Sequence, residues 1–553
     1  MRKTTLAAAI CAALLPAAGS HAGEREDLLK LQATTMSLIE VLVKEGVLSQ
    51  EGADKLLAQA KRKAAAEVQR AEEQEPASSA QAAQTAGNGQ DVRVTYVPQF
   101  VRDEIRDQVR AELREDVAAD VLAEAKNQQW GVPGVLPDWT NRIKLKGDLR
   151  LRGQGEYYAE DNGAYFDWQA SNDDGANTLL NTTENRQKMR VRLRLGIDAR
   201  VTENILAGVR LTTGDTDNPV STNQSLGNYN NRYQMVVDQA YLRYDALNDE
   251  QQRWLRLWGG RIPNPWLSTD LVWDGDLGFE GVAGTLSKQI RFGEGLYAED
   301  EAERSVFLTL GAFPLSTEKA YGSDDKWLYG AQLGTDWGFE NQSRLELGLA
   351  YYDYQNIEGQ PQPLAGLSTD WTVPAYMQKG NSVFDIAGTG NPPYALVADF
   401  DILNFTARYD FTRFAPTHVI LSGDYARNIG FDAAEILART GLDIEERTDA
   451  YQVGVTVGWP EITKRRDWQV FGFYRHVERD AVLDAFTDSD FHLGGTDAEG
   501  WILGGSYGLA DNTWLTLKYM TADEIHGTYL TDAVGSGVPL GIDVLQLDVN
   551  AKF

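Results

Sequence analysis

After Trp139 the chain alternates between apolar and polar residues. Between Ile143 and Arg152, and again between Lys188 and Leu195, nearly every second residue is apolar and most of the others are charged. Because successive side chains of a strand point to opposite faces, each of these strands has one apolar and one charged face. The pattern predicts about sixteen strands, near residues 142–156, 187–201, 205–213, 236–245, 254–261, 278–292, 305–313, 327–337, 343–354, 397–410, 418–428, 448–458, 467–478, 500–509, 513–521 and 543–553.

The connections between these strands alternate in length. Short ones include 202–204, 338–342, 414–417 and 510–512; long ones are 157–186, 214–235, 262–277, 355–396, 429–447, 479–499 and 522–542. The connection at 293–304 is longer than a tight turn and breaks this rhythm, so the strand count depends on how it is interpreted. A soluble sheet with one wet face would also alternate. Tight turns alternating with long loops, and aromatic residues gathered near strand ends, are instead typical of outer-membrane barrels.

The segment before the barrel has a different period. Residues 1–22 have the basic, apolar and small-residue order of a signal peptide. The pattern then predicts a helical hairpin over 23–72, a linker over 73–95 and a charged amphipathic helix over 96–128. The apolar stripe of the last helix suits coiled-coil packing against partner helices. The fold class is therefore all-β, a transmembrane antiparallel barrel over 140–553, preceded by a helical segment expected in the periplasm.

The last strand alternates from Val544 onward and stops on Phe553. A final strand that ends on phenylalanine resembles the signal that the barrel-assembly machinery reads. Phe553 is therefore the candidate assembly signal.

Several segments carry a family resemblance. They are LLKLQATTMSLIEVLVKEGVLSQEGADKLL (28–57), YVPQFVRDEIRDQVRAELREDV (96–117), IKLKGDLRLR (143–152), NPVSTNQSLG (218–227) and GGRIPNPWLSTDLVWDGDLGFEG (259–281). Together the chain resembles the bacterial putative porins that carry an N-terminal helical region. The resemblance covers nearly the whole mature chain and implies an outer-membrane channel. It brings no catalytic residues and no assigned substrate.

The charged strand faces carry the candidate site. Because a charge at the lipid midplane costs roughly 2–4 kcal/mol, these faces must line the lumen. The candidate pore-lining residues on the first three strands are Arg150, Arg152, Arg190, Arg192, Arg194 and Arg210. In sixteen-stranded porins the third loop folds inward, so by this resemblance Asp270, Asp274 and Asp276 would face the arginines and create a transverse field.

Composition narrows the function. The formal net charge of −29 disfavours nucleic acid as a partner. Cys11, the only cysteine, lies in the signal peptide, so the mature chain has no disulfide. No metal-ligand spacing, nucleophile motif or phosphate loop accompanies the four remaining histidines, so no cofactor, metal or catalytic residue is assigned.

The simplest function is passive diffusion of small hydrophilic solutes or ions. The arginine-lined lumen leaves open an anion- or phosphate-selective porin. A barrel enzyme pairing a serine or aspartate with a histidine, and a tether built on the helices, are the lesser alternatives. Expected partners are outer-membrane lipid, lipopolysaccharide, the barrel-assembly machinery and two further copies in a homotrimer.

Overall fold

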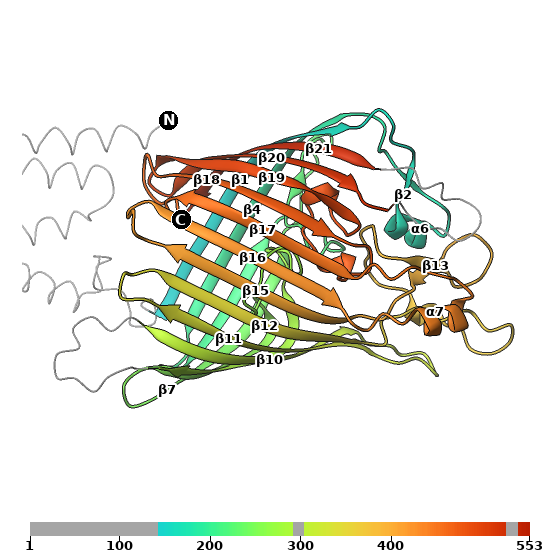
Figure 1. Ribbon diagram of the computed structural model, residues 1–553, viewed down its shortest axis with the longest axis horizontal. Helices are drawn as coiled ribbons and strands as arrows, with labels where there is room; N and C mark the ends of the chain where they lie inside the picture. Colours follow the sequence, from blue (N-terminus) through green and yellow to red (C-terminus); the bar gives the residue numbers. More distant parts are fainter. Residues whose placement is uncertain (1–141, 291–302, 527–539) are drawn as a thin grey trace, which may run out of the picture. The chain divides into compact units, whose positions relative to one another are not determined.

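The computed structural model describes residues 142–290, 303–526 and 540–553. One sheet contains the two-residue strand β6 (Gln224–Ser225) and sixteen longer strands, and it closes because β1 pairs with both β21 and β4. Figure 1 shows the resulting barrel. The long strands are β1 (Ile143–Tyr158), β4 (Arg186–Arg200), β5 (Ile205–Thr212), β7 (Val236–Leu247), β8 (Arg253–Ile262), β9 (Phe279–Gln289), β10 (Arg304–Ser316), β11 (Lys326–Gly338), β12 (Arg344–Gln355), β15 (Asp401–Phe411), β16 (His418–Asn428), β17 (Asp449–Gly458), β18 (Trp468–Val477), β19 (Ala498–Ala510), β20 (Thr513–Glu524) and β21 (Gly541–Lys552).

Each of the sixteen predicted ranges overlaps one of these strands, so the predicted antiparallel barrel is confirmed. The largest difference is at β15, which begins at Asp401 rather than at residue 397. Val397 instead donates its backbone N–H to the carbonyl of Ser382, 2.8 Å away, within the preceding loop. The apolar run before β15 therefore packs inside the barrel mouth and does not extend the wall.

Part of the sequence prediction concerns segments that the model does not describe. The signal peptide (1–22), the helical hairpin (23–72), the linker (73–95) and the charged helix (96–128) all lie outside the described residues. Most of the connection at 293–304 does as well. In the described part of the chain, no helix combines the length and apolar character needed to cross a membrane.

The two faces of the wall follow the alternation in the sequence. Leu145, Leu151 and Met189 are exposed on the outside of the barrel. On the inside, polar residues such as Gln332 and Asp424 bond to a loop that enters the lumen. Closure pairs the backbone groups of the wall with each other, which a lipid environment requires.

The connections at the two ends of the barrel differ in length. The short turns at one end include 201–204, 248–252, 339–343, 412–417, 459–467 and 511–512. The other end carries the loops, named here L1 (159–185), L2 (213–235), L3 (263–278), L4 (317–325), L5 (356–400), L6 (429–448), L7 (478–497) and L8 (525–540, described at 525–526 and 540). This is the asymmetry of outer-membrane barrels, whose tight turns face the periplasm.

The loops contain short helices and strands. L1 contains β2 (Tyr165–Phe166), α6 (Trp168–Asp174) and β3 (Leu179–Leu180); L2 contains β6; L5 contains η3 (Asp370–Thr372), β13 (Val383–Asp385) and β14 (Tyr394–Leu396); L6 contains α7 (Ala433–Thr440); L7 contains η4 (Asp484–Phe486) and η5 (Phe491–Leu493). The ends of α7 follow directly from the sequence. The Asp432 side chain accepts from the N–H groups of Ala434 and Glu435, and Gly441 (φ 78°) takes the left-handed conformation at the C-terminus.

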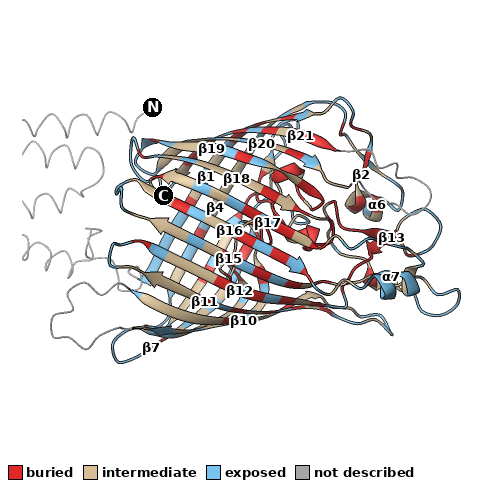
Figure 2. Cartoon of the chain, in the orientation of Figure 1, coloured by how far each residue is buried: buried red, intermediate tan, exposed pale blue. Residues whose placement is uncertain are grey.

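The loops bring an apolar core into the barrel mouth. Trp273 of L3, Met377 and Phe400 of L5 and Leu483 of L7 are buried in one hydrophobic cluster with residues of the wall. Figure 2 shows that buried residues gather at the loop end, while the turn end is mostly intermediate or exposed. We call the inward-packed parts of L3, L5 and L7 the loop plug.

Candidate functional site

L3 leaves β8 and runs inside the lumen. The Trp266 ring packs edge-on against Tyr352 of β12, with centroids 5.3 Å apart. The Leu267 N–H donates to Gln332 Oε1 of β11 at 2.8 Å, and Thr269 Oγ1 donates to Asp424 Oδ2 of β16 at 2.7 Å. Counted round the closed sheet, β11, β12 and β16 lie three, four and six strands from β8, so the loop crosses the interior of the barrel.

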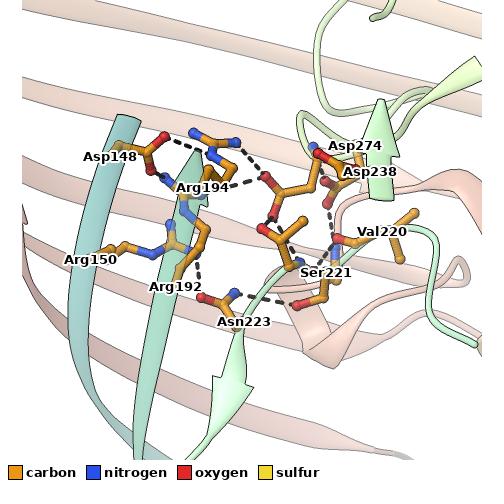
Figure 3. Close-up of polar contacts among 12 residues, drawn as sticks. Asp148, Arg150, Arg192, Arg194, Val220, Ser221, Asn223, Asp238 and Asp274 are labelled. Atoms are coloured by element: carbon orange, nitrogen blue, oxygen red, sulfur yellow. Dashed lines mark hydrogen bonds and ion pairs between the residues drawn. The ribbon is translucent and has the colours of Figure 1, made fainter. Parts of the chain in front are cut away.

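Arginines hold L3 to two separate parts of the wall. Asp270 pairs with Arg475 of β18 at 2.7 Å. Asp276 pairs with Arg194 at 3.1 Å and with Arg192 at 3.5 Å, both on β4. Figure 3 shows Arg192 and Arg194 of β4 facing the inward segments that carry Ser221 and Asp274. L3 is therefore fixed across the lumen by charge at both ends of its crossing.

Asp274 takes no part in these arginine contacts. Its carboxylate accepts from the backbone N–H of Asp276 at 2.6 Å and from that of Ser489 in L7 at 3.1 Å. Burial, together with the negative charges of Asp488 and Asp276, raises its pKa to about 8. Near neutral pH this acid therefore carries little charge. Of the three L3 acids, Asp276 alone contacts the arginines of the first strands.

A set of basic side chains lines the lumen on β1, β4 and β5. We call it the basic wall, and it comprises Arg150, Arg152, Arg186, Lys188, Arg190, Arg192, Arg194 and Arg210. In the register of β1 and β4, Arg150 lies opposite Arg192 and Arg152 lies opposite Arg190. Because like charges directly across a strand pair repel, this arrangement needs carboxylates nearby.

Carboxylates compensate most of the basic wall. Arg152, 2% exposed, pairs with Asp548 of β21 and Asp490 of L7, each at 2.8 Å. Asp148 lies 3.0 Å from Arg192 and 2.8 Å from Arg194.

The remaining pairs lie at the edges of the wall. Glu156 pairs with Arg186 at 3.0 Å and with Lys188 at 2.6 Å, and Arg210 pairs with Asp238. These contacts account for every member of the wall except two.

The two exceptions are Arg150 and Arg190. Arg150 donates to the neutral amide oxygen of Asn223 at 2.5 Å. Within the described residues Arg190 has no carboxylate at ion-pair distance, and the buried Nε atoms of both arginines have no hydrogen-bond partner. The basic wall thus carries positive charge that its own acids do not match.

L2 also enters the lumen, which the sequence reasoning missed. Thr222 donates to Asp276 Oδ2 through its backbone N–H at 3.2 Å and its hydroxyl at 2.8 Å. Asn223 contacts Arg150, and β6 pairs with β4 through Ser225 opposite Arg190. These residues belong to the segment NPVSTNQSLG. Its family resemblance was the one sequence feature that could have indicated a role for L2 in the site. Asp148 was visible as an acid on the arginine face, whereas nothing in the sequence pointed to Asp490.

Two cavities lie at the loop end of the lumen, and one of them borders the basic wall. A cavity of about 480 Å³ is lined by Arg186, Lys188 and Arg190 of β4 and by residues of L1, L2, L5 and L7. A second cavity of about 690 Å³ lies among Thr212, Ser221, Arg261 and other residues near the loop end. A closed barrel with an inward loop and a charged lumen defines a transmembrane channel as the class of protein.

The comparison with family models agrees with this class. The model of the putative porin family matches residues 32–553. Among solved structures, Pseudomonas putida OprB at high pH is 10% identical and covers 77% of this chain and 97% of its own, with a TM-score of 0.43. The channel DcaP of Acinetobacter baumannii is 12% identical over 74% of this chain and 97% of its own, with a TM-score of 0.37. A comparison with curated proteins returns no significant match.

The chain belongs to the putative porin family, because the family model covers nearly its whole length. It is an outer-membrane porin, and the family and fold indicate a channel.

Proposed function

We propose that this porin is a passive diffusion channel for small hydrophilic solutes, and that its narrowest passage favours anions. The observation that carries the proposal is the excess of cationic side chains on the basic wall. Six carboxylates, those of Asp148, Glu156, Asp238, Asp276, Asp490 and Asp548, pair with its basic side chains. Arg150 and Arg190 are left over, so a solute beside this wall meets net positive charge.

The proposed constriction lies between the basic wall and the inward segments of L2 and L3. Asp276 and Thr222 support this position, since they bring both loops against Arg192 and Arg194. Asp274 adds little negative charge there because its pKa is raised to about 8. The formal charge of −29 belongs to the whole chain, and charge at the constriction governs selectivity more than charge elsewhere.

A reversal-potential measurement tests the anion preference. In a planar bilayer with a KCl gradient, we expect the purified protein to pass chloride more readily than potassium. Arg190→Gln should shift the reversal potential toward potassium, because it removes a lumen charge that no carboxylate balances. Arg408→Gln is the matched control, since Arg408 lies on β15 and is paired with Glu346 at 3.1 Å. A potassium-preferring channel in the unmodified protein would refute the anion preference.

We also propose Phe553 as the assembly signal. Its backbone N–H donates to the carbonyl of Gly147 at 2.9 Å, and the N–H of Gly147 donates to the Phe553 carbonyl at 2.7 Å. Deleting Phe553 removes both bonds at the junction that closes the barrel. We expect less heat-modifiable protein in the outer-membrane fraction with unchanged export, whereas Phe553→Tyr should insert normally. Normal insertion of the deletion variant would contradict the proposal.

The partner proposals concern the outside of the barrel and the segment before it. We propose that the apolar outer face contacts membrane lipid and lipopolysaccharide, that the helices before residue 140 lie in the periplasm, and that three copies associate. The outward leucines, including Leu145 and Leu151, support the lipid contact. Sedimentation in detergent checks the trimer, and a single monomeric species would exclude it.

A further inference from the structure

Arg150 and Arg190 are neighbours on the same face of adjacent strands. Arg150 lies opposite Arg192, and Arg190 lies one lumen-facing position farther along β4, opposite Arg152. Side chains at such diagonal positions of an antiparallel pair are within reach of each other when they are long. The two arginines that lack carboxylates therefore occupy neighbouring lumen-facing positions of the wall.

The intervening arginines do not share their carboxylates with this site. Arg152 is held by Asp548 through Nε and Nη2, at 2.8 and 2.9 Å, and by Asp490 through Nη1. Arg192 is held by Asp148 and Asp276. Among the described residues, Arg150 and Arg190 are therefore the members of the basic wall without a carboxylate at ion-pair distance. Their buried Nε atoms lack a hydrogen-bond partner, as do those of Arg186 and Arg192.

Space and further donors are available beside Arg190. It lines the cavity of about 480 Å³ together with Ser221 of L2 and Ser489 of L7. Three carboxylates also lie on the cavity wall, and among the described residues only Glu156 of these is paired with cations. Glu156 is held by Lys188 and Arg186, Asp167 accepts from the Ala170 N–H at 3.0 Å, and Asp173 accepts from Gln169 at 3.1 Å.

The chemistry of these groups selects the ligand. The planar guanidinium group binds carboxylates and phosphates through two parallel hydrogen bonds, which a simple halide cannot form. Two such groups without carboxylates, one of them lining a cavity that also has hydroxyl donors, match a small polyatomic oxyanion. We propose that Arg150 and Arg190 form a saturable binding site for one small oxyanion, a carboxylate or a phosphate, in the passage of this channel. The site rests on the proposed function, because the oxyanion must enter the lumen to reach it.

The test is block of chloride current in a planar bilayer. Inorganic phosphate and succinate are titrated separately, at constant chloride and constant ionic strength. We expect at least one of them to reduce the chloride current saturably, and which one does so distinguishes a phosphate site from a carboxylate site. In the double variant Arg150→Gln/Arg190→Gln, the half-blocking concentration should rise at least tenfold. Arg408→Gln, which changes the same charge elsewhere in the lumen, should leave it unchanged.

A second double variant separates the effect of charge on block from the effect of donor geometry. Arg150→Lys/Arg190→Lys keeps both charges but loses the forked donors, so the half-blocking concentration should rise about threefold while the reversal potential stays as in the unmodified protein. The lysine double variant also tests the oxyanion site if the glutamine double variant fails to insert. Anion preference without saturable block, or block that persists in both double variants, would overturn the oxyanion site and leave the proposed function standing. If the unmodified protein shows no anion preference, the proposed function itself is wrong.

Discussion

Replacing Arg475 with methionine is expected to release L3 and L7 from the barrel wall and to increase the single-channel conductance. Arg475 of β18 is only 3% exposed, and it pairs with Asp270 of L3 at 2.7 Å and Asp488 of L7 at 3.0 Å. Its guanidinium also lies over the Phe491 ring, 5.0 Å from the centroid. Removing one partner of a buried ion pair costs roughly 3–5 kcal/mol, because the other charge, here that of Asp488 at 11% exposure, stays buried without compensation.

The control for this prediction is Arg408→Met. Arg408 makes an ion pair with Glu346 as well, but its side chain is 44% exposed. Exposed pairs contribute about 0–1 kcal/mol, so this variant should conduct like the unmodified protein. If Arg475→Met inserts as a heat-modifiable barrel and its conductance is unchanged, Arg475 does not hold the loop plug in place.

Trp273→Ala is expected to loosen the apolar core of the loop plug without unfolding the barrel. The Trp273 ring packs against Phe279 of β9 at 4.9 Å, Tyr352 of β12 at 5.0 Å and Phe486 of L7 at 5.9 Å. Truncating a buried tryptophan to alanine costs about 3–5 kcal/mol, partly because it leaves a cavity. Limited proteolysis of the folded protein should then cleave within L3 or L7, where the unmodified protein resists.

Trp254→Ala provides the comparison. Trp254 lies on β8, outside the plug, and is 47% exposed. Its truncation should leave the proteolysis pattern of the loops unchanged. Equal resistance of L3 and L7 in the Trp273 and Trp254 variants would show that the aromatic cluster contributes little to the plug.

The strands could be placed from the sequence because a barrel wall imposes a simple local rule. One face must be apolar toward lipid and the other polar toward the lumen, so the period of two is present in every strand. Leu145 and Arg150 illustrate the rule, since the first is exposed on the outside and the second lines the inside. The rule fails at Val397 and Phe400, where an apolar run is buried in the plug instead of facing lipid.

The loop contacts could not be read in the same way. Asp270, Asp274 and Asp276 look alike in sequence, yet one pairs with Arg475, one bonds to backbone N–H groups and one pairs with Arg192 and Arg194. Asp276 and Arg194 are 82 residues apart in the chain. No local pattern specifies such a partner, because it depends on where two separate loops enter the lumen.

By itself the sequence determined the barrel, its strand positions and the charged character of its lumen, because alternation is a local property of each strand. Only the tertiary structure decided which charges remain uncompensated. L3, L7 and β21 bring carboxylates to the basic wall from distant parts of the chain and help to neutralise Arg152, Arg192 and Arg194, whereas L2 brings only the amide oxygen of Asn223 to Arg150. Arg150 and Arg190 are distinguished from the other arginines solely by the absence of a carboxylate at that place, which is a consequence of long-range packing.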